Sequence, residues 1–246
     1  STDVGFSMFI VGRTGTRKST LTALALSHFG QFTGKSLPSS FNDTSNYIRK
    51  KAFYLKDCLL AVDDYHPSTS PMQKRQMART AQELSRAFGD SAGRGRMLAN
   101  TELQRSMPPR ALAIMSGEEM PQVGESGVAR YFTLRLEEED VPIGDDLTKL
   151  QDDAAEGWLR LSMRGYLEWL APQAGQLPDE LMEMFRDLRA AAQEKVKGVH
   201  PRSHEAMAML MVGLTMFLRY LSSLKILAES DIDIFRDEMW SVLAEH

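Results

Sequence analysis

The sequence is poor in cysteine and in long apolar runs. Its single cysteine, Cys58, excludes an internal disulfide framework and suits the reducing cytoplasm. No stretch has the pattern of a signal peptide, and the apolar stretch of residues 207–227 is interrupted by Arg219 and Lys225, so we read it as a buried helix rather than a membrane span. We therefore expect a cytoplasmic protein without a membrane partner.

The sequence also lacks a strong net charge, internal repeats and low-complexity segments. A formal net charge of -4 gives no global reason to expect nucleic acid, although basic residues are concentrated between residues 72 and 110. The content of 43% hydrophobic and 25% charged residues in a chain of 246 is ordinary for one large globular domain or two small ones.

An acidic segment, residues 137–146, contains Pro142 and Gly144 and marks a domain boundary. We predict one domain over residues 1–140 and a helical one over residues 141–246. Helical patterns in the second domain cover residues 147–171, 179–197, 202–228 and 231–244. The third is the most apolar, so we expect it at the centre of a bundle, with its methionines filling the core.

A glycine-containing stretch lies between the apolar run of residues 6–11 and a helical pattern. It resembles G-x-x-x-x-G-K-[S/T], in which backbone N–H groups surround phosphates, the lysine reaches the β and γ oxygens and the hydroxyl helps to hold Mg²⁺. We therefore predict a nucleoside triphosphate site; the alternative is a look-alike or inactive loop. The predicted binding residues are Gly12, Arg13, Thr14, Gly15, Thr16, Arg17, Lys18, Ser19 and Thr20.

Arg17 stands where the pattern has its second glycine. Gly15 could supply part of the missing backbone freedom. We expect the replacement to cost little if the backbone of Arg17 stays helical; the alternative is that it marks a slow or specialised enzyme.

Polar residues end two further apolar runs. Asp63 and Asp64 follow residues 58–62, where the first acid would hold Mg²⁺ and the second would orient or deprotonate the attacking water. Ser116 follows residues 111–115, on a strand expected between the loop and the acidic pair, and is a second candidate for positioning that water. The alternatives are a strand end followed by a polar turn and an ordinary strand-to-turn serine.

A basic helix leads into a glycine-arginine turn. The helical pattern of residues 71–88 carries arginines on one stripe, and Arg94 and Arg96 follow in a turn that we predict to be part of a hairpin. Arginines on such a loop suit phosphate contacts with single-stranded or duplex DNA without base reading. The alternative is a surface or subunit contact.

The order of these parts resembles AAA+ ATPases, and most of all the helicases of phages and mobile elements that are associated with primases and related to superfamily 3 and MCM-like helicases. The resemblance implies an α/β P-loop NTPase fold, with a parallel sheet flanked by helices and followed by an all-helical lid. The stretches that carry it are residues 12–20, 60–67, 92–96, 108–118 and 129–132.

The resemblance also implies a role for each matching residue. The reaction would use ATP and Mg²⁺ in a ring, expected to be a hexamer, around single-stranded DNA. The implied assignments are Lys18 and Ser19 as the Walker A lysine and metal ligand, Asp63 and Asp64 as the Walker B pair, Ser116 as sensor 1, Arg130 as the arginine that reaches a neighbouring subunit, Arg202 as sensor 2, and Arg94 and Arg96 as pore arginines.

Three functions follow from the sequence. The first is the motor of a DNA helicase, excised from a longer polypeptide with a primase or polymerase domain N-terminal to it, because the chain begins almost on its first strand. The second is a nucleotide-binding switch or assembly ATPase without unwinding activity, motivated by Arg17 and Asp64. The third, a small-substrate kinase, is disfavoured by the hairpin arginines and Arg130.

Overall fold

The computed structural model describes residues 4–66, 70–90, 107–141 and 143–244. The predicted hairpin with Arg94 and Arg96 lies outside the described residues. The chain divides into two compact units, one of residues 4–161 and one that contains residues 162–244. Each is described by itself, and the boundary between residues 140 and 141 stays a prediction.

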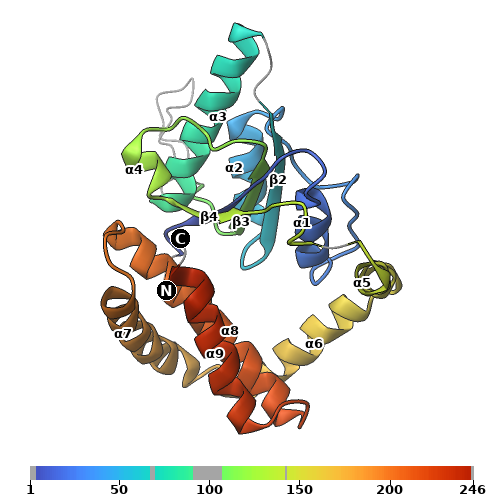
Figure 1. Ribbon diagram of the computed structural model, residues 1–246, viewed down its shortest axis with the longest axis vertical. Coiled ribbons are helices and arrows are strands. Elements are labelled where there is room, and N and C mark those ends of the chain that lie inside the picture. Colours follow the sequence, from blue (N-terminus) through green and yellow to red (C-terminus); the bar gives the residue numbers. More distant parts are fainter. Residues whose placement is uncertain (1–3, 67–69, 91–106, 142, 245–246) are drawn as a thin grey trace, which may run out of the picture. The chain divides into compact units, whose positions relative to one another are not determined.

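The first unit is built on a parallel sheet of four strands in the order β2-β3-β1-β4 (Figure 1). In register, Phe9 of β1 pairs with Met115 of β3 and Thr133 of β4. β3 thus lies between the strand before the phosphate loop and the strand with the acids, as the sequence predicted. The strands are β1 (Ser7–Val11), β2 (Leu59–Tyr65), β3 (Leu112–Gly117) and β4 (Tyr131–Arg135).

Helices cover both faces of this sheet, which explains why its strands are nearly continuous apolar runs. On one face Ile48 of α2 and Leu84 of α3 pack with Phe9 and Met115 in one buried cluster. On the other face Leu21 of α1 packs against a second cluster. The helices of this unit are α1 (Lys18–Leu26), α2 (Ser45–Tyr54), α3 (Pro71–Gly89), α4 (Glu125–Val128) and α5 (Asp145–Glu156).

The second unit is helical as far as it is described. α8 packs against α7 and α9, and its buried Met207 and Met211 confirm that this helix contributes methionines to the core. The prediction of one helix over residues 147–171 is wrong, because Gly157 takes a φ of 99° and separates α5 from α6. The remaining elements are α6 (Trp158–Leu170), the 3-10 helix η1 (Ala171–Gln173), α7 (Leu177–Lys195), α8 (Pro201–Ser223) and α9 (Glu229–Ala244).

Among the described residues, α8 alone is long and apolar enough to cross a membrane by length and composition. The core helix of a soluble protein meets the same criterion. In its most apolar window, 44% of the residues are buried within the protein, and the helix packs against α7 and α9.

Candidate active site

The phosphate loop connects the end of β1 to the start of α1. A Cβ on Gly12 would lie 2.5 Å from the carbonyl oxygen of Leu136, and Gly15 has a φ of 97°, so both positions favour glycine. The buried Thr16 donates from its hydroxyl to the Arg13 carbonyl at 2.9 Å. Because α1 begins at Lys18, its unpaired N–H groups and positive dipole end lie beside the loop, as an anion site requires.

The backbone of Arg17 is not helical, so the condition under which the sequence made the replacement inexpensive is not met. Its φ of 63° and ψ of 25° are left-handed, a conformation that costs a residue with a side chain about 1–2 kcal/mol. Its guanidinium donates to the carbonyl of Glu138 at 2.9 Å and to that of Val141. Arg17 therefore adopts a backbone conformation that favours glycine. Its side chain links the loop to the segment after β4 through two hydrogen bonds.

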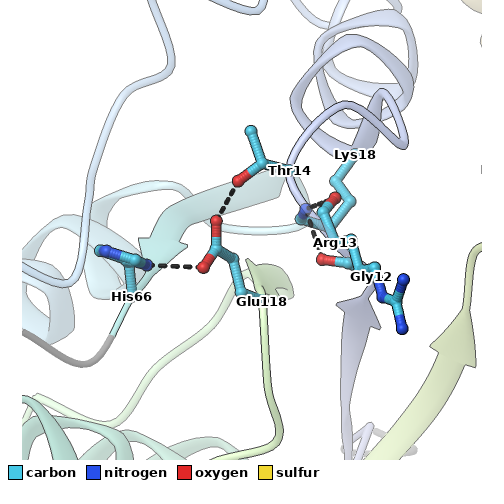
Figure 2. Close-up of polar contacts among 6 residues, drawn as sticks. All are labelled: Gly12, Arg13, Thr14, Lys18, His66 and Glu118. Carbon is cyan, nitrogen blue, oxygen red and sulfur yellow. Dashed lines mark hydrogen bonds and ion pairs between the residues drawn. The ribbon is translucent and has the colours of Figure 1, made fainter.

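Lys18 is directed along the loop. Its ammonium donates to the carbonyls of Gly12 at 2.7 Å and Arg13 at 2.9 Å (Figure 2). Burial lowers the pKa of Lys18, while the charges of Glu118, Asp63 and Asp64, in that order, oppose the shift. The Lys18 ammonium therefore lies against the loop carbonyls and is affected by the charges of these carboxylates.

The carboxylate of Asp63 joins three elements. The Ser19 hydroxyl of α1 donates to its Oδ2 at 2.8 Å, and the fully buried Ser116 of β3 donates to its Oδ1. The structure thus brings together these three predicted residues, and it shows Ser116 orienting the acid. Carboxyl ends of parallel strands meet at one edge of a sheet, which explains why residues so far apart in sequence converge.

A magnesium ion bound with phosphates uses one or two protein oxygen ligands and several waters. Ser19 and Asp63 present such a hydroxyl and carboxylate beside the loop. Within the described residues, no cluster of three or more His, Cys, Asp or Glu side chains could hold a metal by itself. The residues present therefore fit Mg²⁺ that is shared with a triphosphate.

Asp64 differs from its neighbour. Its φ is 66°, at an irregularity where the pairing of β2 with β3 shifts between Val62 and Tyr65. The side chain is exposed, and it makes no hydrogen bond or ion pair among the described residues. The bulge therefore turns the second acid away from the network that holds Asp63.

Two residues at this edge were not assigned from the sequence. The Glu118 carboxylate accepts a hydrogen bond from the Thr14 hydroxyl of the loop and lies 2.7 Å from Nδ1 of His66 (Figure 2). The Thr14 hydrogen bond, more than His66 or Lys18, lowers the pKa of Glu118. The sequence contained one indication of these two residues, which was their position. His66 follows the end of β2, and Glu118 follows the end of the adjacent parallel strand β3.

A cavity of about 380 Å³ lies beside this pair. Its lining combines a loop hydroxyl with basic and acidic side chains, so it is a polar space at the entrance to the phosphate loop. The residues around it are Arg13, Thr14, His66, Lys74, Glu118 and Glu119.

Arg130 lies at the other edge of the sheet. It directly precedes β4, and its carbonyl accepts from Ser7 at the start of β1 at 3.0 Å, whereas the phosphate loop follows the end of β1. Its guanidinium forms a two-pronged ion pair with Asp90, with distances of 3.1 and 3.0 Å, and also donates to the Ser126 carbonyl. Arg130 is therefore not part of the loop site of its own chain.

The contacts described above assign no role to two further predicted residues. Arg202 belongs to α8 in the helical unit, and its backbone N–H donates to Nδ1 of His200 at 3.2 Å. Thr20 lines another cavity, of about 100 Å³, together with residues of α5. Their assignments remain predictions.

No family model and no curated protein matches the sequence. Among solved structures, the fold is similar to SCCmec type IV Cch, described as an active helicase, with a TM-score of 0.60 and 16% identity over 98% of this chain and 42% of that one. A DNA polymerase III gamma subunit-related protein from Thermotoga maritima gives a TM-score of only 0.30, with 14% identity over 90% of this chain and 73% of that one, which is too low to carry an argument.

The likeness to Cch supports a helicase-like α/β fold, and the parallel sheet flanked by helices is consistent with a P-loop NTPase. The chain spans less than half of the length of the Cch helicase. The activity of that whole protein is therefore not carried over to this chain by the likeness.

Proposed function

We propose that the chain is the ATP-hydrolysing motor domain of a ring-forming DNA helicase that acts in phage or mobile-element DNA replication. The observation that carries this proposal is the convergence of Ser19, Asp63 and Ser116 next to Lys18. This arrangement offers a cation for phosphate and an oxygen pair for Mg²⁺. The similarity of the fold to the Cch helicase supports the choice of a motor over other P-loop proteins.

The residues at the loop have different roles in binding the nucleotide and the metal. The backbone N–H groups of the loop and of the first turn of α1 bind phosphate oxygens, and Lys18 adds a positive charge. Ser19 and Asp63 hold Mg²⁺, which neutralises charge on the phosphates when bound. Ser116 keeps the Asp63 carboxylate in position through its hydrogen bond.

Arg130 would act on the site of a neighbouring subunit. Its place at the opposite edge of the sheet from the loop supports a role in trans, as in a ring that we take to be a hexamer. To reach a neighbour's phosphate, the guanidinium must leave Asp90, with which it pairs in this structure. An arginine supplied in this way is worth about three to five powers of ten in rate.

Contacts with DNA are assigned from the sequence. We propose that Arg94 and Arg96 bind the phosphates of single-stranded DNA in the pore of the ring and that Arg202 senses the nucleotide. These contacts should follow the phosphate backbone and weaken with salt.

A second candidate is a switch or assembly ATPase that binds nucleotide without unwinding DNA. The observation that favours it is the exposed, left-handed Asp64, since a motor with fast turnover needs a well-placed base. Such a protein would bind ATP through Lys18 but would show slow hydrolysis that DNA does not stimulate.

Two variants test the motor. We expect Lys18→Ala and Arg130→Ala each to lose DNA-stimulated ATP hydrolysis, because one lacks the phosphate cation and the other the trans arginine. An equimolar mixture should recover part of the activity, since some interfaces then combine an intact loop with an intact Arg130. Wild-type turnover by Arg130→Ala, or a mixture no more active than its components, would contradict the shared site.

A further inference from the structure

Glu118 presents its carboxylate to the phosphate loop from the neighbouring strand. It lies two residues after Ser116, where β3 has just ended, and its backbone N–H donates to the Tyr65 carbonyl of β2 at 3.1 Å. This hydrogen bond fixes the start of the turn beside the phosphate loop. Its side chain bonds to Thr14, whose residue lies at the exposed tip of that loop.

The charge of the Glu118 carboxylate also acts on Lys18. Among the three acids that act on the lysine, Glu118 has the largest electrostatic effect, ahead of Asp63 and Asp64. In a phosphate loop the lysine reaches the β and γ oxygens. Because Glu118 accepts a hydrogen bond from Thr14 of the loop, its carboxylate lies beside the segment that would hold a triphosphate.

His66 and Thr14 hold the carboxylate from two sides. Oε1 accepts from the Thr14 hydroxyl, and Oε2 faces the imidazole of His66 at 2.7 Å (Figure 2). Two partners on separate oxygens restrict rotation of the side chain, which is how a base is pre-positioned. The adjoining cavity of about 380 Å³ has room for water.

We propose that Glu118, rather than Asp64, orients and deprotonates the water that attacks ATP, an assignment that rests on the proposed function. The water oxygen forms a bond to the γ-phosphorus as its proton passes to Glu118. The bond from that phosphorus to the bridging oxygen breaks, and its electron pair leaves with ADP. Asp64 is held less firmly than Glu118, because its side chain, at the irregularity in β2, makes no hydrogen bond among the described residues.

The test compares single amide substitutions in the intact chain, measured for hydrolysis and for affinity toward a fluorescent ATP analogue. Glu118→Gln removes the charge but keeps an oxygen that can accept from Thr14. We expect its turnover to fall about 10²–10⁴-fold, the usual contribution of a general base, with nucleotide affinity within about threefold of wild type. Glu183→Gln makes the same amide change at an exposed glutamate of α7; it is the matched control and should hydrolyse ATP normally.

A second readout follows the bound nucleotide. After incubation with ATP and Mg²⁺, Glu118→Gln should retain unhydrolysed ATP through gel filtration, whereas wild type should carry ADP. If Glu118 only supported the loop, the substitution would instead weaken affinity and lower the unfolding midpoint.

The outcomes separate the two proposals. A larger fall in turnover for Asp64→Asn than for Glu118→Gln would overturn the assignment of the base while leaving the motor intact. A wild-type chain that binds no nucleotide would contradict the phosphate site, and with it both proposals.

Discussion

Polar side chains serve different purposes at the carboxyl edge of the sheet and in the helical unit. At the sheet edge, Asp63 and Glu118 each join segments that are far apart in sequence. In the helical unit, the ion pair between Arg189 and Glu205 at 3.1 Å lies on the surface, where such pairs add at most about 1 kcal/mol. Its buried side chains are mainly apolar, such as the fully buried Met211.

Substitutions in the two regions should therefore impair different properties of the protein. In the proposed function, the polar network at the sheet edge serves ATP hydrolysis, and it contributes little apolar burial. The helical unit depends on apolar packing around α8 for its stability. Substitutions should therefore affect rate in one region and unfolding in the other.

Of the substitutions that compare the two regions, Asp63→Asn should have the largest effect. Asp63→Asn removes the charge that accepts from Ser19 and would hold Mg²⁺, and we expect ATP hydrolysis to fall about 10²–10³-fold with the thermal midpoint nearly unchanged. Asp64→Asn is the adjacent control and should lose less. Equal losses in a steady-state assay would mean that the bulge does not separate the two acids.

The next effect is on stability. Met211→Ala should lower the free energy of unfolding by about 2–5 kcal/mol, because it leaves a cavity at a fully buried position of α8. Phe217→Ala on the same helix, at a side chain 43% exposed, should cost less. Urea unfolding followed by circular dichroism gives both values, and a similar cost for both variants would contradict the packing of α8.

The smallest effect concerns the backbone of Arg17. Arg17→Gly and Arg17→Ala both remove the guanidinium that binds the carbonyls of Glu138 and Val141, but only glycine relieves the left-handed strain. We expect the glycine variant to be about 1 kcal/mol more stable than the alanine variant. If urea midpoints place alanine level with glycine, residue 17 does not hold a positive φ in solution.

Local patterns predicted the elements of the first unit well. The apolar runs before the loop, before Asp63 and before Ser116 are strands of one parallel sheet, because buried parallel strands need side chains that are apolar on both faces. The single helix expected over residues 147–171 was wrong, since a left-handed Gly157 interrupts an otherwise helical pattern.

The candidate site was predictable only where motif spacing carried information. Lys18, Ser19 and Asp63 followed from that spacing, and the structure brings them to one place. The bond between Thr14 and Glu118 joins residues 104 positions apart, and Arg130 meets Asp90 across 40 positions. Such pairs depend on strand register and loop path, which a pattern of residue types does not contain.

In the proposed motor, ATP hydrolysis needs two copies of the chain. The most direct test is the specific ATPase rate per chain, measured against protein concentration with and without single-stranded DNA. We expect the rate to rise with concentration and DNA to shift the rise to lower concentration, because Arg130 must come from a neighbour. A specific rate that is constant over the whole range would contradict the shared site.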